Sequence, residues 1–180
     1  MVQIRPVTLA DAGGIAAIYN PYVLGTWVSF ETEAVAAATM AQRIAEVQSA
    51  TLPWLVAEHA GQLLGYACAT PWKGRPAYRH SVESTVYLDR AHLGRGLGGR
   101  LYSALLAELR ARQLHTAIGG IALPNAPSVA LHERLGFRKV AHFEQVGHKL
   151  GRWVDVGYWQ LLLQPTASSD ALATADSGTD

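Results

Sequence analysis

The stretch that decides the fold is Glu83-Ser-Thr-Val-Tyr-Leu-Asp89, followed closely by Leu93-Gly-Arg-Gly-Leu-Gly-Gly99. The first run is rich in β-forming residues, and the second is a glycine turn before a strong helical pattern over residues 100–112. A strand, a glycine turn and a helix start place unpaired backbone N–H groups around a phosphate. Because Glu83 stands at the head of this strand, the order indicates a phosphate-bearing cofactor beside a candidate base.

The glycine turn lacks the signatures of nucleotide binding. It has no Lys-Ser/Thr pair of the P-loop kind, and no dinucleotide-type acidic residue is evident about 20 residues further on. Its glycines permit positive φ and close approach to a ligand, and Arg95 and Arg100 add charge against a diphosphate. The glycines are Gly94, Gly96, Gly98 and Gly99. A plain turn with helix capping and no ligand is the alternative interpretation.

The composition is that of an ordinary globular chain. It has 180 residues, of which 49% are hydrophobic and 16% charged, and this length fits one domain with a sizeable core. The net charge is +1 without massed basic residues, which argues against bulk nucleic-acid binding. Cys68 is the single cysteine and lies in an apolar run, so we expect a buried, inert thiol. No run reaches the ~20 apolar residues of a membrane span and no signal-peptide pattern opens the chain, so we expect a cytoplasmic protein.

The rest of the chain alternates strand and helix patterns, which predicts one α/β domain of mixed topology over residues 1–163. The expected strands are residues 2–5, 54–59, 62–70, 84–88, 116–123, 137–142 and 154–163. The other expected helices follow Thr8-Leu-Ala-Asp11 and end or kink at Asn20-Pro21, cover residues 34–49, and run from a Ser128 cap to Gly136. The Ala/Ser/Thr/Asp-rich segment over residues 164–180 is expected to be a disordered tail.

Three single residues carry candidate chemistry. Glu83, near an apolar cavity, would be a usable base, although a solvated strand end is its ordinary role. Asn125 lies at a strand end, and His132 lies beside the inward-packing face of the following helix, where a lone histidine is more often a satisfied core residue. The other histidines show no metal-ligand spacing, so we expect no metal.

The loop over residues 72–78 places two cations, Lys73 and Arg75, among aromatic residues. Such a loop can clamp an acidic substrate, and a solvated loop is the alternative.

Taken together, these segments resemble the GNAT superfamily of acetyl-CoA-dependent N-acetyltransferases, and within it the phosphinothricin or methionine sulfoximine N-acetyltransferases. The resemblance covers about residues 2–163 and includes Pro53-Trp-Leu-Val-Ala-Glu58, Leu123-Pro-Asn-Ala-Pro-Ser-Val129 and Gly151-Arg-Trp-Val-Asp-Val-Gly-Tyr-Trp-Gln160. The family motif Q/R-x-x-G-x-G/A aligns with Leu93-Gly-Arg-Gly-Leu-Gly98, where Leu93 departs from the usual Gln or Arg. The resemblance implies an α/β (α+β) fold with a mixed, mostly antiparallel central sheet flanked by helices.

The resemblance also implies roles for single residues. Glu83 would be the general base, and His132 would protonate the leaving thiolate of acetyl-CoA, the co-substrate. The residues expected to bind acetyl-CoA are Val86, Tyr87, Leu88, Leu93, Gly94, Arg95, Gly96, Leu97, Gly98, Gly99 and Asn125. The residues expected to bind a small amino-acid-like acceptor are Phe30, Lys73, Arg75, Tyr78, Glu83, Ser84, Thr85 and Tyr87, with Phe30 reaching the site from the mate of a homodimer.

Two other functions stay open at this point. One is a GNAT enzyme that acetylates a protein N-terminus, a polyamine or an aminoglycoside, although an acidic site would suit the last two better than a loop with Lys73, Arg75 and Arg79. The other is a non-catalytic acyl-CoA-binding module, which would need neither Glu83 nor His132.

Overall fold

The computed structural model describes residues 1–164, so the expected tail beyond residue 164 lies outside the described part of the chain. The helices are α1 (Ala12–Gly25), α2 (Ala37–Ser49), α3 (Leu97–Ala111) and α4 (Ala126–Arg134). The strands are β1 (Gln3–Pro6), β2 (Trp54–His59), β3 (Gln62–Pro71), β4 (Ser81–Leu88), β5 (Thr116–Leu123), β6 (Arg138–Lys149) and β7 (Arg152–Leu162). Within these described residues, no helix combines the length and apolar character needed to cross a bilayer.

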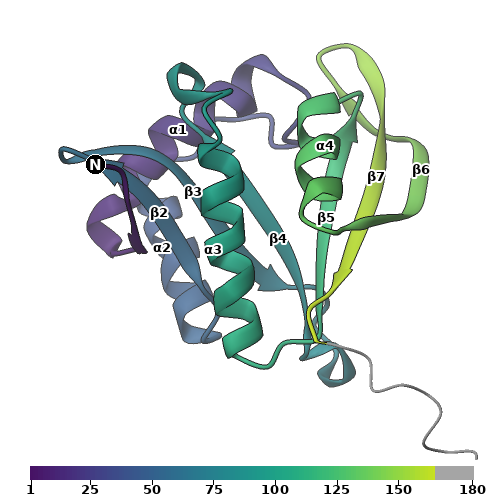
Figure 1. Ribbon diagram of the computed structural model, residues 1–180. Coiled ribbons are helices and arrows are strands. Elements are labelled where there is room, and N and C mark those ends of the chain that lie inside the picture. Colours follow the sequence, from purple (N-terminus) through teal and green to yellow (C-terminus); the bar gives the residue numbers. More distant parts are fainter. Residues whose placement is uncertain (165–180) are drawn as a thin grey trace, which may run out of the picture.

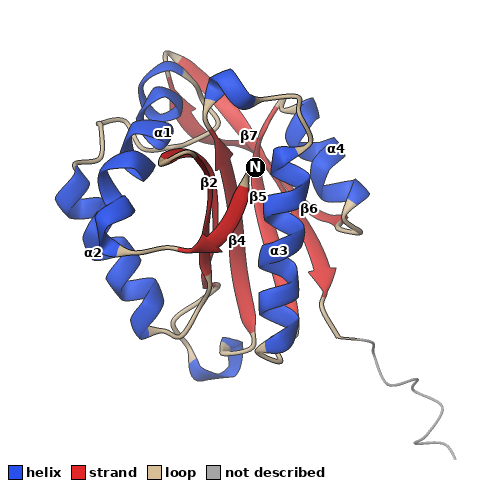
Figure 2. Ribbon diagram, turned by 60° about the vertical axis from the view of Figure 1, so that its left-hand side comes forward, coloured by secondary structure: helices blue, strands red, loops and turns tan. Residues whose placement is uncertain are grey.

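The strands form a single sheet in the order β1-β2-β3-β4-β5-β7-β6. Every neighbouring pair is antiparallel except β4 and β5, which are parallel. The sheet lies between two helical layers, with α1 and α2 on one face and α3 and α4 on the other (Figure 2). The expected mixed, mostly antiparallel sheet with flanking helices is therefore confirmed.

The two parallel strands separate in the middle of the sheet. The β4–β5 pairing begins at Ser81 with Thr116 and ends at Glu83 with Ile118. Both strands continue well beyond this point, and Figure 1 shows them diverging towards the end where α3 and α4 begin. The opening between the diverging halves starts at Glu83.

Side chains on β4 alternate between two hydrophobic cores. Val86 packs with the core beneath α3, where Tyr102 and Leu105 are fully buried. Tyr87 packs with the core beneath α1 and α2, which includes the fully buried Ile44. Because successive side chains of a strand point to opposite faces, β4 presents chemistry to both sides of the opening.

The first helix does not end or kink at Asn20-Pro21, contrary to the expectation. It runs through Pro21 to Gly25. A proline inside a helix costs about 3 kcal/mol because it removes one backbone hydrogen bond and crowds the preceding turn. Burial of Tyr19 and Val23 on either side of Pro21 offsets this cost, and the Asn20 side chain exchanges two hydrogen bonds with the backbone of Val35.

Two further boundaries differ from the expected ones. The helix α4 is capped by Asn125 and not by Ser128, since Asn125 Oδ1 accepts the backbone N–H of Ser128 at 3.3 Å. The strand β6 continues to Lys149, well past the expected end at residue 142, because its register with β7 recovers after an irregularity between Phe143 and Gly147. Such a break disguises the period-2 pattern in the sequence.

Candidate active site

The glycine turn forms an open concave backbone before α3. Gly94 and Gly96 have φ values of +74° and +75°, and a Cβ atom at either position would meet no atom within 4 Å. Gly96 is the N-cap of α3 and has no side chain to accept a hydrogen bond. Since the first bond of the helix runs from the Arg100 N–H to the Gly96 carbonyl, the N–H groups of residues 97–99 have no partner within the helix. This arrangement fits the pyrophosphate of a cofactor.

The side chains around this turn leave it open. Arg95, Arg100 and Leu93 are all exposed, and 52% of Leu93 is accessible. The packing of α4 against the start of α3 is close, because a Cβ atom on Gly98 would lie 3.7 Å from Leu131. The end of β5 with Asn125 and the glycine turn therefore border the same end of the opening.

Glu83 stands where β4 and β5 separate. Its side chain is half-buried, and burial raises the pKa of the carboxyl group, while the positive charge of Lys73 opposes that rise. A Cβ atom on Gly120 would lie 3.3 Å from Glu83 Oε1 and 3.2 Å from Tyr158 Cε1. Gly120 therefore leaves the space in which the carboxylate and the tyrosine ring lie close together.

Aromatic rings surround the Glu83 side of the opening. Tyr158 makes edge-to-face contacts with Trp72 and Phe143, at centroid distances of 5.6 and 5.7 Å. The ammonium group of Lys73 lies 4.9 Å from the centre of the Trp72 ring. Lys73 is exposed, and its charge acts on the Glu83 carboxyl group. Arg75 and Tyr78 of the same loop are exposed as well.

His132 lies on the opposite face, within a buried chain of hydrogen bonds. Its Nδ1 is 2.8 Å from the Ser128 carbonyl oxygen, and its Nε2 is 3.1 Å from the Tyr102 hydroxyl. The Tyr102 hydroxyl is in turn 2.7 Å from Ser84 Oγ. Because a carbonyl only accepts, Nδ1 carries the hydrogen in the neutral ring and Nε2 accepts from Tyr102. Burial lowers the pKa of His132 and favours this neutral form.

The other expected acceptor-binding residues divide between the two faces. The Ser84 side chain faces α3 through its bond to Tyr102, whereas Thr85 and Tyr87 face α1 and α2. The Phe30 ring lies against Gly147 of β6 in the same chain, where a Cβ atom would overlap it. Ser84 is therefore the one expected acceptor ligand on β4 whose side chain lies on the His132 side.

The sequence interpretation missed three positions that shape this site. Tyr158 lies beside Glu83, Tyr102 connects Ser84 to His132, and Gly119 gives His132 the room to lie against β5. Two consecutive glycines inside an apolar strand were the available signal, because glycine in a strand interior often marks close approach by another group. Within residues 1–164, no group of three or more His, Cys, Asp or Glu side chains is placed to hold a metal ion.

Comparison with known proteins identifies the family of this chain. The family described as Acetyltransferase (GNAT) domain matches residues 4–157. The phosphinothricin N-acetyltransferase of Streptomyces viridochromogenes is 42% identical over 88% of this chain and 86% of its own. The L-methionine sulfoximine/L-methionine sulfone acetyltransferase of Salmonella typhimurium is 38% identical over 94% of this chain and 99% of its own.

A solved structure adds the cofactor. The protein yncA of Salmonella typhimurium, determined with its cofactor acetyl-CoA, superposes with a TM-score of 0.90 at 37% identity, covering 95% of this chain and 99% of that one. The uncapped helix start and the open glycine backbone suit the pyrophosphate of the same molecule. The chain therefore belongs to the GNAT family and is an acetyltransferase that takes its acetyl group from acetyl-CoA.

Proposed function

We propose that this chain transfers the acetyl group of acetyl-CoA to the α-amino group of a small amino-acid-like acceptor, such as phosphinothricin or methionine sulfoximine or sulfone. The observation that carries the proposal is the position of Glu83, a half-buried carboxylate at the point where β4 and β5 separate. The two relatives whose names contain these acceptors support the substrate class.

Glu83 acts as the general base. An amino acid carries an ammonium group at neutral pH, and this group cannot attack a thioester until it loses a proton. A raised pKa makes the Glu83 carboxylate a stronger base than an ordinary exposed glutamate. Glu83 takes the proton directly or through a water molecule, and the free amine attacks the acetyl carbonyl.

The diverging part of β4 supplies the donor for the oxyanion. Beyond Glu83 this strand pairs with β3 on one side only, so backbone groups near Val86 face the opening. A backbone N–H in this position stabilises negative charge as it develops on the acetyl oxygen. Transfer occurs directly between the two substrates, and the buried Cys68 carries no acetyl group, since burial raises the pKa of its thiol to about 12.

His132 is the proposed proton source for the leaving thiolate. To donate, its ring must carry a proton on Nε2, and the Tyr102 hydroxyl must then turn its hydrogen toward Ser84. Because burial lowers the pKa of His132, this form is present mainly on the acidic side of neutrality. Activity that depends on it falls as the pH rises.

Lys73 and Arg75 hold the anionic groups of the acceptor. Lys73 lies close enough to Glu83 to affect its pKa, so a carboxylate bound to Lys73 leaves its neighbouring amine beside the base. Arg75 and Tyr78 lie on the exposed loop that follows, where they can close over a bound acceptor.

The proposal includes a homodimer of this chain. Large apolar side chains are exposed on β6, on β7 and at the turn between them, and β6 is an edge strand. They are Val140, Phe143, Val146, Leu150 and Trp153. An exposed apolar surface of this kind marks an interaction site. Phe30 lies at its border, which supports a position next to the site of the mate in a homodimer.

Replacing Glu83 with glutamine tests the base. Glutamine keeps the shape but cannot accept the proton, so turnover should fall by roughly 100- to 10,000-fold while acetyl-CoA binding is kept. Thiol release is measured with phosphinothricin, methionine sulfoximine, methionine sulfone, ordinary amino acids, a polyamine and an N-terminal peptide. Wild-type turnover in the variant at saturating substrate would remove Glu83 from this role. Release with the peptide alone would overturn the acceptor class.

A further inference from the structure

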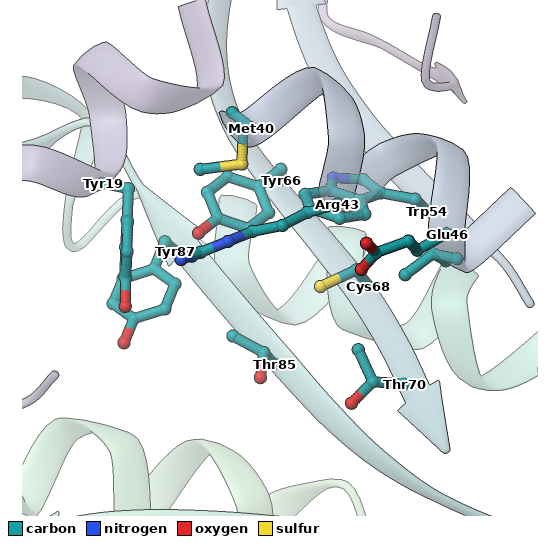
Figure 3. A pocket seen from close by; sticks show the side chains of 11 residues that line it. Tyr19, Met40, Arg43, Glu46, Trp54, Tyr66, Cys68, Thr70, Thr85 and Tyr87 are labelled. Atoms are coloured by element: carbon teal, nitrogen blue, oxygen red, sulfur yellow. The ribbon is translucent and has the colours of Figure 1, made fainter. Parts of the chain in front are cut away.

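A pocket of about 250 Å³ lies between α2 and the sheet (Figure 3). Glu83 is on the same face of the sheet, since Thr85 and Tyr87, which line the pocket, follow it at every second position along β4. Thr70 and Thr85 form its end nearest the base. Thr70 is the register partner of Glu83 on β3, and Thr85 follows Glu83 by two residues on β4. Residues two apart along a strand are separated by roughly 6.5 Å. An acceptor whose amine lies at Glu83 therefore has its side chain within reach of this pocket.

The floor of the pocket is a row of aromatic rings. Trp54 and Tyr66 are stacked with centroids 5.6 Å apart, and Tyr66 and Tyr87 are stacked at 5.7 Å. Met40 of α2 lies over these rings (Figure 3). Such a surface buries the hydrocarbon stem of a side chain favourably.

Arg43 brings hydrogen-bond donors to this apolar floor. It extends from α2 across the pocket toward Tyr19 and Tyr87 (Figure 3). Glu31 holds its guanidinium group with bonds of 2.7 and 3.0 Å, and Tyr19 donates to the same carboxylate at 3.0 Å. A guanidinium has five N–H donors, and these two bonds are its only ones within residues 1–164. Three fixed donors remain for a ligand.

The formal charges around the pocket are balanced. Glu31 pairs with Arg43, Glu46 on the next turn of α2 lines the pocket, and Lys149, which donates to the Ser29 carbonyl, adds a second cation near Glu31. A ligand is therefore held here by hydrogen bonds to the remaining donors of Arg43 rather than by an unbalanced charge.

We propose that this pocket takes the acceptor side chain and selects an elongated one that ends in hydrogen-bond-accepting oxygens, with its stem on the aromatic row and its oxygens on Arg43. This inference rests on the proposed function and narrows its acceptor class. Methionine sulfone, methionine sulfoximine and phosphinothricin fit this description, whereas an amino acid with a plain hydrocarbon side chain does not.

The test compares acceptors of similar length in the wild type and in Arg43→Met. Loss of a charged donor should raise the KM for L-methionine sulfone by about 10- to 100-fold. The KM for L-norleucine, which has no side-chain oxygen, should change by less than about threefold, and that for acetyl-CoA should not change. Glu31→Gln breaks the same ion pair but keeps the guanidinium, so it should affect the sulfone much less. Arg134→Met, at an exposed position of α4, controls for the loss of one arginine.

The outcomes separate this inference from the proposed function. Equal losses for the sulfone and for norleucine in Arg43→Met, or a loss in Glu31→Gln as large as in Arg43→Met, would overturn the pocket and leave the acetyl transfer intact. Calorimetric titration of L-methionine sulfone into the protein with CoA present needs no turnover. Binding that Arg43→Met weakens, without acetylation, would support the pocket and overturn the proposed reaction. Neither binding nor acetylation would overturn both.

Discussion

Glu83 and His132 have pKa values shifted toward each other by the same cause. Burial raises the pKa of the Glu83 carboxyl above its ordinary 4.5 and lowers the pKa of the His132 imidazole below its ordinary 6.5. The proposed base works only when it is ionised, and the proposed acid works only when it is protonated. The pH range in which Glu83 is ionised and His132 is protonated is therefore narrowed at both its acidic and its basic end.

The pH dependence of the reaction tests these two assignments together. Activity should rise with pH through the raised pKa of Glu83 and fall again above the lowered pKa of His132. His132→Gln should remove the falling limb of this pH profile. The measurement is kcat/KM of both proteins across the pH range. A falling limb that survives in this variant would mean that His132 only positions Tyr102 through its hydrogen bond.

The part of α3 that bears on function is its N-terminal turn. Gly96 has a φ of +75° at the N-cap, and a residue with a Cβ is strained in that conformation by about 1–2 kcal/mol. Gly61, in the turn between β2 and β3, has a φ of +79°, and a Cβ atom there would also meet no atom within 4 Å. It lies outside the glycine turn that precedes α3. Both positions therefore require a positive φ, but only Gly96 borders the expected pyrophosphate site.

Gly96→Ala and Gly61→Ala form a matched pair. Both should lower the free energy of unfolding by a similar amount in a urea titration. Only Gly96→Ala should raise the KM for acetyl-CoA, by about 10-fold, because it disturbs backbone donors of the phosphate cradle. A similar rise in Gly61→Ala would show that the effect comes from general destabilisation.

The strand β5 depends on glycine at the point where His132 packs against it. Gly119→Ala should push the imidazole away from Tyr102 and lower the free energy of unfolding by about 1–3 kcal/mol. Gly13→Ala on α1 is the control, since its Cβ would meet nothing within 4 Å and should stabilise the helix by up to about 1 kcal/mol. Thermal or urea unfolding distinguishes them, and an unchanged stability in Gly119→Ala would contradict the packing argument.

Local sequence patterns predicted most of these helices and strands, whereas the contacts between them became visible only in the structure. The hairpin around Ala60-Gly61 and the helix after Gly96 follow from turn residues and periodicity alone. The course of α1 through Pro21 depends on burial that no local pattern reports. Among the proposed site residues, Glu83 was predicted from its place before the glycine turn. Arg43 was not predicted, because its only signal in the sequence was one charge on an amphipathic helix.

At the scale of the whole molecule, the edge strand β6 presents the apolar surface that the proposed dimer would cover. Val146→Lys places a charge there and should shift the molar mass in light scattering from about twice 19.4 kDa toward one copy. Leu9→Lys changes a similarly exposed leucine in the short helical turn before α1 and should leave the mass unchanged. A wild type that is already monomeric at high concentration would rule out the dimer.

The separation of β4 from β5 has a consequence for hydrogen exchange. A central strand is ordinarily the slowest-exchanging part of a sheet, since its amides donate in turn to the strands on both sides and few are left free. Beyond Glu83, however, β4 pairs with β3 alone. In the absence of acetyl-CoA, some amides in the middle of this molecule should therefore exchange with solvent almost as fast as those of a surface loop. Bound ligand would slow that exchange without any change in the fold.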